Sequence, residues 1–164
     1  WAPWRQTYME AHTNVNKCFL CEKGRTGVDD ENYILHREAS SYILLNEYPY
    51  NTGHLLVSPY VHTGNIEELD QKTGVELWSL QKQAVEVLSL VYGPDGFNIG
   101  MNLGASAGAA LIDHLHIHIV PRWAGDTNYM SVLNNTKVLS EMLKDTFNRL
   151  KPHFSVNQYN SSTE

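Results

Sequence analysis

The stretch HLHIHIVPRW, residues 114–123, places three of the chain's eight histidines at alternate positions, His114, His116 and His118. On a β-strand alternate residues share one face, so the three imidazoles would lie together while the apolar residues between them pack on the core. The outer two would be ~13 Å apart along such a strand, whereas a Zn–N bond is only ~2.0–2.1 Å long. One ion can therefore bind neighbouring members of the row but not readily all three. The row is either a catalytic device or a solvated polar face.

The chain's two cysteines form a pair, Cys18 and Cys21, in the sequence CFLC. Two thiolates at this spacing commonly supply half of a tetrahedral zinc site. A redox dithiol is the alternative, but no thioredoxin-like βαβ pattern surrounds the pair, and a disulfide across two residues would be strained. His62 and His114 are the best candidates for the missing ligands, because one follows a predicted strand and the other opens the triad strand.

Two helices and a set of short strands must position these residues. The hydrophobic periodicity predicts amphipathic helices at about residues 72–92 and 135–150. Runs of β-prone residues predict five strands, at residues 32–38, 41–47, 53–58, 97–102 and 111–120. The order β-β-β-α-β-β-α, mostly linked by hairpins, predicts an α+β fold with an antiparallel sheet.

Length and composition predict one globular domain over residues 1–151, followed by a polar C-terminal tail at residues 152–164. The net charge of −6, without a run of Lys or Arg, argues against a nucleic-acid partner, although a pocket for a small anion can still be locally positive. No apolar run approaches the ~20 residues that a membrane span requires. The opening WAPWRQTYM lacks a signal-peptide pattern, so we expect a cytoplasmic protein.

Residues 114–120, HLHIHIV, resemble the His-φ-His-φ-His-φ-φ signature of the histidine triad (HIT) superfamily, in which φ is apolar. The segment NEYPYNTGH is similar to the ribose-contact strand and Pro-Gly-His-type turn of the same superfamily, with Thr52 in place of the usual Pro. The opening WAPWR and the run PRWAGDTNYM resemble the branch that contains diadenosine tetraphosphate phosphorylases. The resemblance covers roughly residues 1–151.

This resemblance implies an HIT-like antiparallel five-stranded sheet with a long helix packed on it and a C-terminal helix, in a homodimer whose two sheets become continuous. It implies that His116 attacks an α-phosphorus and forms a nucleotidyl-histidine, that a backbone carbonyl near His114 orients His116, and that His118 faces the phosphate oxygens. The expected substrate is a dinucleoside polyphosphate such as diadenosine tetraphosphate, with adenine nucleotides as the expected ligands. Phosphate is the expected acceptor, and no organic cofactor is expected.

Two other functions remain open. The first is a hydrolase of dinucleoside polyphosphates or nucleoside phosphoramidates, which would pass the nucleotide to water. The second is a nucleotide-binding sensor or interaction protein with weak turnover. In zinc-bearing relatives a C-x-x-C pair, an upstream histidine and the first triad histidine share one ion. Carried over, these ligands are Cys18, Cys21, His62 and His114, a closed and therefore structural zinc site.

The resemblance also suggests a nucleotide pocket, with less specific signals. Asn46 is a candidate for the ribose hydroxyls, Asn102 for phosphate or ribose, and Arg122 for the outer phosphates, although a surface arginine is nearly as good an interpretation. Much of the superfamily has Gln or Ser in the phosphate loop, where this chain has Ala109 and Ala110. The full set of expected substrate contacts is Phe19, Ile43, Asn46, His54, Asn102, Gly108, Ala109, Ala110, Arg122 and Trp123. Phe19 and Ile43 would line a purine pocket, or simply belong to the core.

Overall fold

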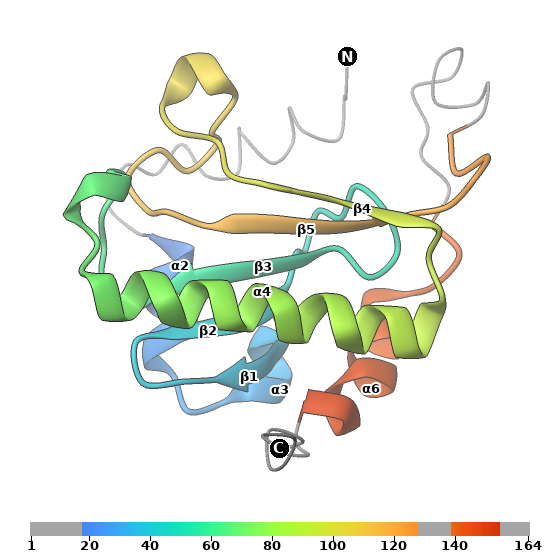
Figure 1. The fold of residues 1–164 in the computed structure, drawn as a ribbon. Coiled ribbons are helices and arrows are strands. Elements are labelled where there is room, and N and C mark those ends of the chain that lie inside the picture. The colour runs from blue at the N-terminus through green and yellow to red at the C-terminus, as the bar shows by residue number, and fades with distance from the viewer. Residues whose placement is uncertain (1–17, 128–138, 155–164) are drawn as a thin grey trace, which may run out of the picture.

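The structure, a computed structural model, describes residues 18–127 and 139–154. One antiparallel sheet of five strands runs in the order β1-β2-β3-β5-β4 (Figure 1). Its strands are β1 (Ile34–Arg37), β2 (Ser41–Leu45), β3 (Leu55–Pro59), β4 (Gly96–Gly100) and β5 (Ile117–Arg122). The helices are α2 (Phe19–Arg25), α3 (Asp29–Asn32), α4 (Gln71–Tyr92) and α6 (Leu143–Phe154), with short 3₁₀ turns η1 (Ile66–Glu68) and η2 (Ala105–Ala107). The predicted α+β class, with a long helix on an antiparallel sheet and a C-terminal helix, is confirmed.

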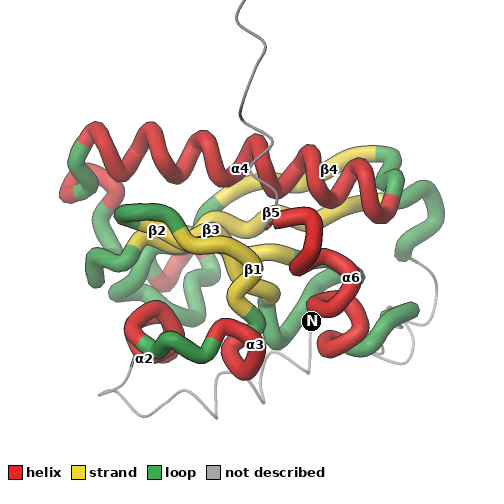
Figure 2. The backbone as a smooth tube through the Cα atoms, turned by 90° about the horizontal axis from the view of Figure 1, so that it is seen from below, coloured by secondary structure: helices red, strands yellow, loops and turns green. Residues whose placement is uncertain are grey.

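Helix α4 packs on one face of the sheet, and α2 and α3 lie on the other (Figure 2). Alternation along β2 sorts the side chains, because Ile43 and Leu45 face α4 while Tyr42 and Leu44 face α2. The same rule operates on β5, where Ile117 and Ile119 join the core beneath α4. The even-numbered residues of β5 therefore share the face that carries α2.

The sequence sets both ends of α4. The Asp70 carboxylate accepts a hydrogen bond of 2.7 Å from the backbone N–H of Thr73, which caps the first turn. Gly93 ends the helix in a left-handed conformation, with φ 54° and ψ 51°, and its N–H bonds to the carbonyl of Ser89. Between these caps Leu77, Leu80 and Leu88 are buried, as the periodicity predicts.

The largest differences from the predicted boundaries are in β5 and α6. Strand β5 begins at Ile117 rather than at residue 111, because the backbone N–H of Leu115 donates to the carbonyl of Thr63 at 2.7 Å instead of joining the sheet. Helix α6 runs through residue 152 to Phe154, whose side chain is buried, so the expected polar tail includes the last turn of this helix. Of the helix predicted from residue 135, residues 135–138 lie outside the described residues and residues 139–142 are not helical, so the helix begins at Leu143.

The described helices of the chain do not include one that is both long and apolar enough to cross a membrane. The short helices α2 and α3 were not predicted from the sequence, and α2 proves central to the site described next.

Candidate active site and metal centre

His116 lies immediately before β5 and is held by the backbone carbonyl of His114. Its Nδ1 is 2.9 Å from the carbonyl oxygen of His114. A carbonyl can only accept a hydrogen bond, so Nδ1 carries the proton and Nε2 keeps its lone pair. Burial lowers the pKa of His116 below the ordinary value, which favours the neutral ring. A neutral imidazole with a free nitrogen is what nucleophilic attack on phosphorus requires.

Two successive hydrogen bonds orient His118: one joins the backbone of Tyr50 to His54, and the other joins His54 to His118. The backbone N–H of Tyr50 donates to Nδ1 of His54 at 3.0 Å, so the His54 proton must lie on Nε2. That Nε2 is 2.9 Å from Nδ1 of His118 and donates to it. A neutral His118 therefore carries its own proton on Nε2, as a hydrogen-bond donor directed away from His54.

His54 contacts His118 rather than solvent, since it is only 1% exposed. Burial, reinforced by the nearby rings of His118 and His116, lowers the pKa of His54 well below the ordinary value. The ring of Tyr50 covers both histidines, with its centroid 4.7 Å from that of His54 and 5.7 Å from that of His118. His54 was expected to contact substrate, and the structure gives it the position of an orienting residue.

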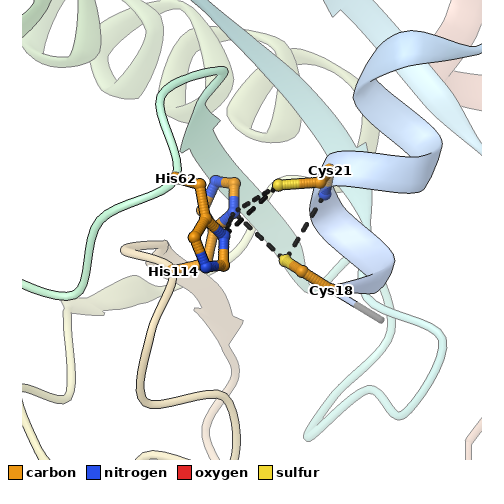
Figure 3. Close-up of side chains that lie close together, drawn as sticks. All are labelled: Cys18, Cys21, His62 and His114. Atoms are coloured by element: carbon orange, nitrogen blue, oxygen red, sulfur yellow. Dashed lines mark hydrogen bonds between the residues drawn. The ribbon is translucent and has the colours of Figure 1, made fainter. Parts of the chain in front are cut away.

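The two cysteines lie close to two histidines, one of which is the first residue of the triad (Figure 3). Cys18 and Cys21 come from α2, His62 from the loop after β3, and His114 from the loop before β5. The Sγ atom of Cys18 is 3.2 Å from Nδ1 of His114, and the Sγ atom of Cys21 is 3.3 Å from Nδ1 of His62. The four potential ligand atoms all lie within 4.8 Å of one another.

This cluster fits a tetrahedral metal ion. Zinc with bonds of ~2.0–2.3 Å separates its ligand atoms by roughly 3.3–3.8 Å, close to the spacings found here. His114 donates from Nε2 to the carbonyl of Pro59 at 2.9 Å, so its Nδ1 has no proton and points a lone pair at the thiols. Burial lowers the pKa of His114 to about 4, and burial raises the pKa of the Cys18 thiol to about 11. A bound cation would replace the thiol protons, and four protein ligands would leave no open position.

Gly64 was not predicted as a site residue. Because it has no side chain, the loop that carries His62 can approach the segment just before His114. A Cβ on Gly64 would lie 2.3 Å from the carbonyl oxygen of Ile112, far inside van der Waals contact. The adjacent bond from the N–H of Leu115 to the carbonyl of Thr63 holds the two segments at that distance. The sequence signal was a glycine two residues after a candidate ligand in VHTGN.

A cavity of about 440 Å³ opens beside His118, between the turn after β2 and the edge strand β4. Asn102 and Arg122, two of the expected contacts, line it together with His118. Arg122 is held on one side by Asp126, with Nε to Oδ2 2.6 Å, and on the other by Oδ1 of Asn98 at 2.6 Å. This ion pair keeps the pKa of Asp126 well below its usual range.

Asn51 is an unexpected wall residue of the same cavity. It is buried, and its amide donates to the carbonyl of Pro121 at 3.1 Å and to Oδ2 of Asp126 at 2.8 Å. Asn51 thus joins the turn after β2 to the end of β5. Its place in NEYPYNTGH, three residues before His54, was the available signal.

The other expected contacts divide between the site and the rest of the fold. Asn46 stabilises its turn, with Oδ1 accepting from the N–H of Tyr48 at 2.9 Å. Phe19 packs on the face of the sheet that carries the triad. Ile43 is fully buried beneath α4, on the opposite face, because it alternates with Tyr42 and Leu44. We therefore leave Ile43 out of the proposed site. Trp123 lines a separate cavity with Tyr92 and Arg149.

At residues 108–110 the loop between β4 and β5 has no polar side chain. Gly108 is left-handed, with φ 84°, and its N–H bonds to the carbonyl of Ala105 at 2.9 Å. The N–H of Ala109 is 3.4 Å from the carbonyl of Gly104, and Ala110 is exposed. Gly108, Ala109 and Ala110 lie in the loop that leads to the triad strand, and none of them lines the cavity beside His118.

The fold and the row of histidines define a class of protein. The family model described as the HIT domain matches residues 27–125, more than half of the chain. The chain therefore belongs to the HIT family, which confirms the resemblance seen in HLHIHIV. A histidine triad nucleotide-binding protein from Sulfolobus tokodaii, described as hypothetical, superposes with a TM-score of 0.66 at 30% identity, over 84% of this chain and 89% of that one.

Within the family, the chain is 43% identical over 118 residues to the AP-4-A phosphorylase of Mycobacterium tuberculosis, which supports the diadenosine tetraphosphate phosphorylase branch. That match covers 72% of this chain and 60% of the mycobacterial protein. A bis(5'-adenosyl)-triphosphatase from Dictyostelium discoideum is 29% identical over 105 residues, or 64% of this chain and 66% of the relative. The branch's WAPWR element and the end of PRWAGDTNYM lie outside the described residues.

Proposed function

We propose that the protein is a nucleotidyl-transferring enzyme that cleaves diadenosine tetraphosphate and related dinucleoside polyphosphates, with inorganic phosphate as the acceptor. The observation that carries this proposal is the hydrogen bond from His116 Nδ1 to the His114 carbonyl, which leaves Nε2 as a free base. The similarity to relatives that act on dinucleoside polyphosphates supports the same substrate class.

In the first step, Nε2 of His116 attacks an α-phosphorus and forms a P–N bond. The P–O bond to the rest of the polyphosphate breaks, and ATP leaves from diadenosine tetraphosphate. The Nε2–H of His118, fixed by the bond from His54, donates to an oxygen as negative charge develops on it. In the second step an oxygen of inorganic phosphate attacks the AMP-histidine, the P–N bond breaks, and ADP is released.

Substrate binding is proposed to use the cavity beside His118. Arg122 and Asn102, which line it, would meet phosphate oxygens there. Asn46, in the turn after β2, would meet the ribose. Residues 108–110 stay a proposed phosphate loop that can contact phosphate only through its backbone, since Ala109 and Ala110 offer no polar side chain. The N–H groups of Gly108 and Ala109 bond within the loop here, so they would have to exchange those bonds for phosphate oxygens. The absence of a polar side chain there favours the second candidate, a nucleotide-binding protein with weak turnover.

We propose zinc as the metal at Cys18, Cys21, His62 and His114, because two thiols and two imidazoles in a tetrahedral arrangement suit this ion best. When bound, zinc would supply structural stability rather than a reactive water. His114 links the two sites, since its Nδ1 faces the metal while its carbonyl holds His116. Two free thiols at such a site suit a reducing compartment, so we also propose a cytoplasmic location.

We propose that the active form is a homodimer, formed by two copies of β4. This strand pairs only with β5, so its other edge is open for a second sheet within the described fold. Ile99 on β4 is 47% exposed and Trp78 on α4 is 65% exposed, which gives a partner apolar surface to cover.

Product analysis tests the reaction. The protein is incubated with diadenosine tetraphosphate, with and without inorganic phosphate, and the nucleotides are separated. We expect ADP and ATP, formed only when phosphate is present. AMP and ATP without any phosphate requirement would indicate a hydrolase instead. AMP binding without turnover would indicate the nucleotide-binding protein.

A further inference from the structure

Helix α2 carries both thiols of the candidate metal centre, but it is too short to hold them in place alone. It has 7 residues, whereas isolated helices shorter than ~12–15 residues are marginal in water. Its position must therefore come from contacts with the sheet. The side-chain contacts of Arg37, on β1, supply most of these at the C-terminal end of the helix.

Both Nη atoms of Arg37 donate to the C-terminal end of α2. Nη1 donates to the carbonyl of Gly24 at 2.7 Å, and Nη2 donates to the carbonyls of Lys23 at 3.2 Å and Thr26 at 2.8 Å. Nε donates to Oδ1 of Asp29 at 2.7 Å, at the start of α3. The carbonyls at the end of a helix have no partner within it and carry partial negative charge, so a fixed cation there is favourable.

Two further contacts, one near each end of α2, show how closely the helix packs on the sheet. The hydroxyl of Tyr42 donates to the carbonyl of Leu20 at 2.7 Å. A Cβ on Gly24 would lie 3.2 Å from Tyr60 and 3.3 Å from Tyr42, so the helix backbone rests on these rings without space to spare. Arg37 is the group that fixes the rotation of α2 on that surface, because a planar fork holds several acceptors in one geometry.

We propose that Arg37 is a positioning residue of the metal centre. By capping α2 it holds the Sγ atoms of Cys18 and Cys21 near Nδ1 of His62 and His114 before any metal binds. This inference rests on the proposed metal site and adds a residue outside the four ligands. Loss of a supporting residue of this kind typically lowers metal affinity about 10- to 100-fold.

The test is the zinc dissociation constant of the full chain, measured by competition with a chromogenic chelator. We expect Arg37→Met to bind zinc about 10- to 100-fold more weakly, and Arg37→Lys to fall between it and the unchanged protein. Glu38→Gln is the matched control, because it alters the 2.9 Å contact between His36 Nε2 and the Glu38 carboxylate, next to β1, without touching α2. Circular dichroism at the assay temperature verifies that each variant is folded.

Arg37→Met with the affinity of the unchanged protein would overturn the assignment. If that variant does not fold, Arg37→Lys decides in its place, since unaltered zinc affinity there would equally contradict a role for the planar fork. Failure of the unchanged protein to bind zinc would refute the metal site itself, and with it this role of Arg37. A loss of affinity equal in Glu38→Gln would show a general loss of stability and would also count against Arg37.

Discussion

At the scale of single residues, the position of one proton decides what each imidazole of the row can do. His114 donates from Nε2 to Pro59 and offers Nδ1 to the metal cluster. His116 donates from Nδ1, which leaves Nε2 for the proposed attack on phosphorus. His118 accepts at Nδ1, so its neutral ring carries the proton on Nε2. Three residues of one type and one spacing thus take three roles, each set by the atom that faces the ring.

The pH dependence of turnover tests the state of His116. Attack requires the neutral ring, and burial moves the pKa of His116 below its ordinary value of 6.5. A lowered pKa keeps the free base populated to lower pH, so activity should persist as pH falls through 6.5 and be lost only below it. The acid limb of kcat/KM against pH measures this, and a limb at or above the ordinary histidine value would contradict the burial argument.

His54→Ala tests the orienting chain behind His118. The variant removes the donor to His118 Nδ1, so the His118 proton is no longer confined to Nε2. Losing a buried hydrogen bond of ~1–3 kcal/mol should lower kcat roughly 5- to 150-fold, with a smaller effect on KM. The control is His153→Ala, an exposed histidine on α6. An equal loss in both variants, or a change confined to KM, would argue against an orienting role.

At the scale of elements, the sequence predicted those that local residues specify and missed those that depend on contacts with distant residues. Helix α4 was predictable, since its caps and its apolar period are written in consecutive residues. Helix α2 was not, because Arg37 and Tyr42, which hold it, are far along the chain. The C-x-x-C spacing and the triad indicated the metal ligands, but nothing local assigned Asn51 or Gly64 to the site. The sequence left Ile43 open between a purine pocket and the core, because a β-strand period gives two faces without saying which is which, and the structure places it in the core beneath α4.

Gly64→Ala tests the close approach of the His62 loop. The added methyl group would meet the Ile112 carbonyl, so the loop must move and carry His62 away from His114. We expect weaker zinc binding and a loss of about 1–3 kcal/mol in the free energy of unfolding. Gly74→Ala on α4 is the control, because its Cβ would have nothing within 4 Å. Zinc titration and urea unfolding measure both effects. Equal behaviour of the two variants would contradict the steric account.

At the scale of the whole molecule, the larger hydrophobic core and the proposed sites lie on opposite faces of the sheet. The face beneath α4 and α6 holds the larger core, which includes Leu88, Ile119 and Leu150. The opposite face carries α2 with the Cys/His cluster, which Figure 3 shows, and the His118 side that borders the cavity beside β4. A change at the metal cluster can therefore reach His116 through His114 without crossing the core.

The open edge of β4 gives a prediction for the assembly. Ile99→Lys places a charge on the surface that two sheets would share, and we expect it to convert a dimer to monomer. Met142→Lys, at an exposed position before α6, is the control and should stay dimeric. Light scattering coupled to size-exclusion chromatography gives the mass of each species. A dimeric Ile99→Lys variant would exclude the β4 edge as the interface.

The central claim is that His116 carries the nucleotide between the two steps. The most direct measurement is intact-protein mass spectrometry after rapid quenching of the reaction with diadenosine tetraphosphate, followed by peptide mapping. We predict one AMP per chain, attached to His116, absent from His116→Ala, and released as ADP when phosphate is added. Turnover without any adduct, or an adduct that persists in His116→Ala, would contradict the proposed mechanism.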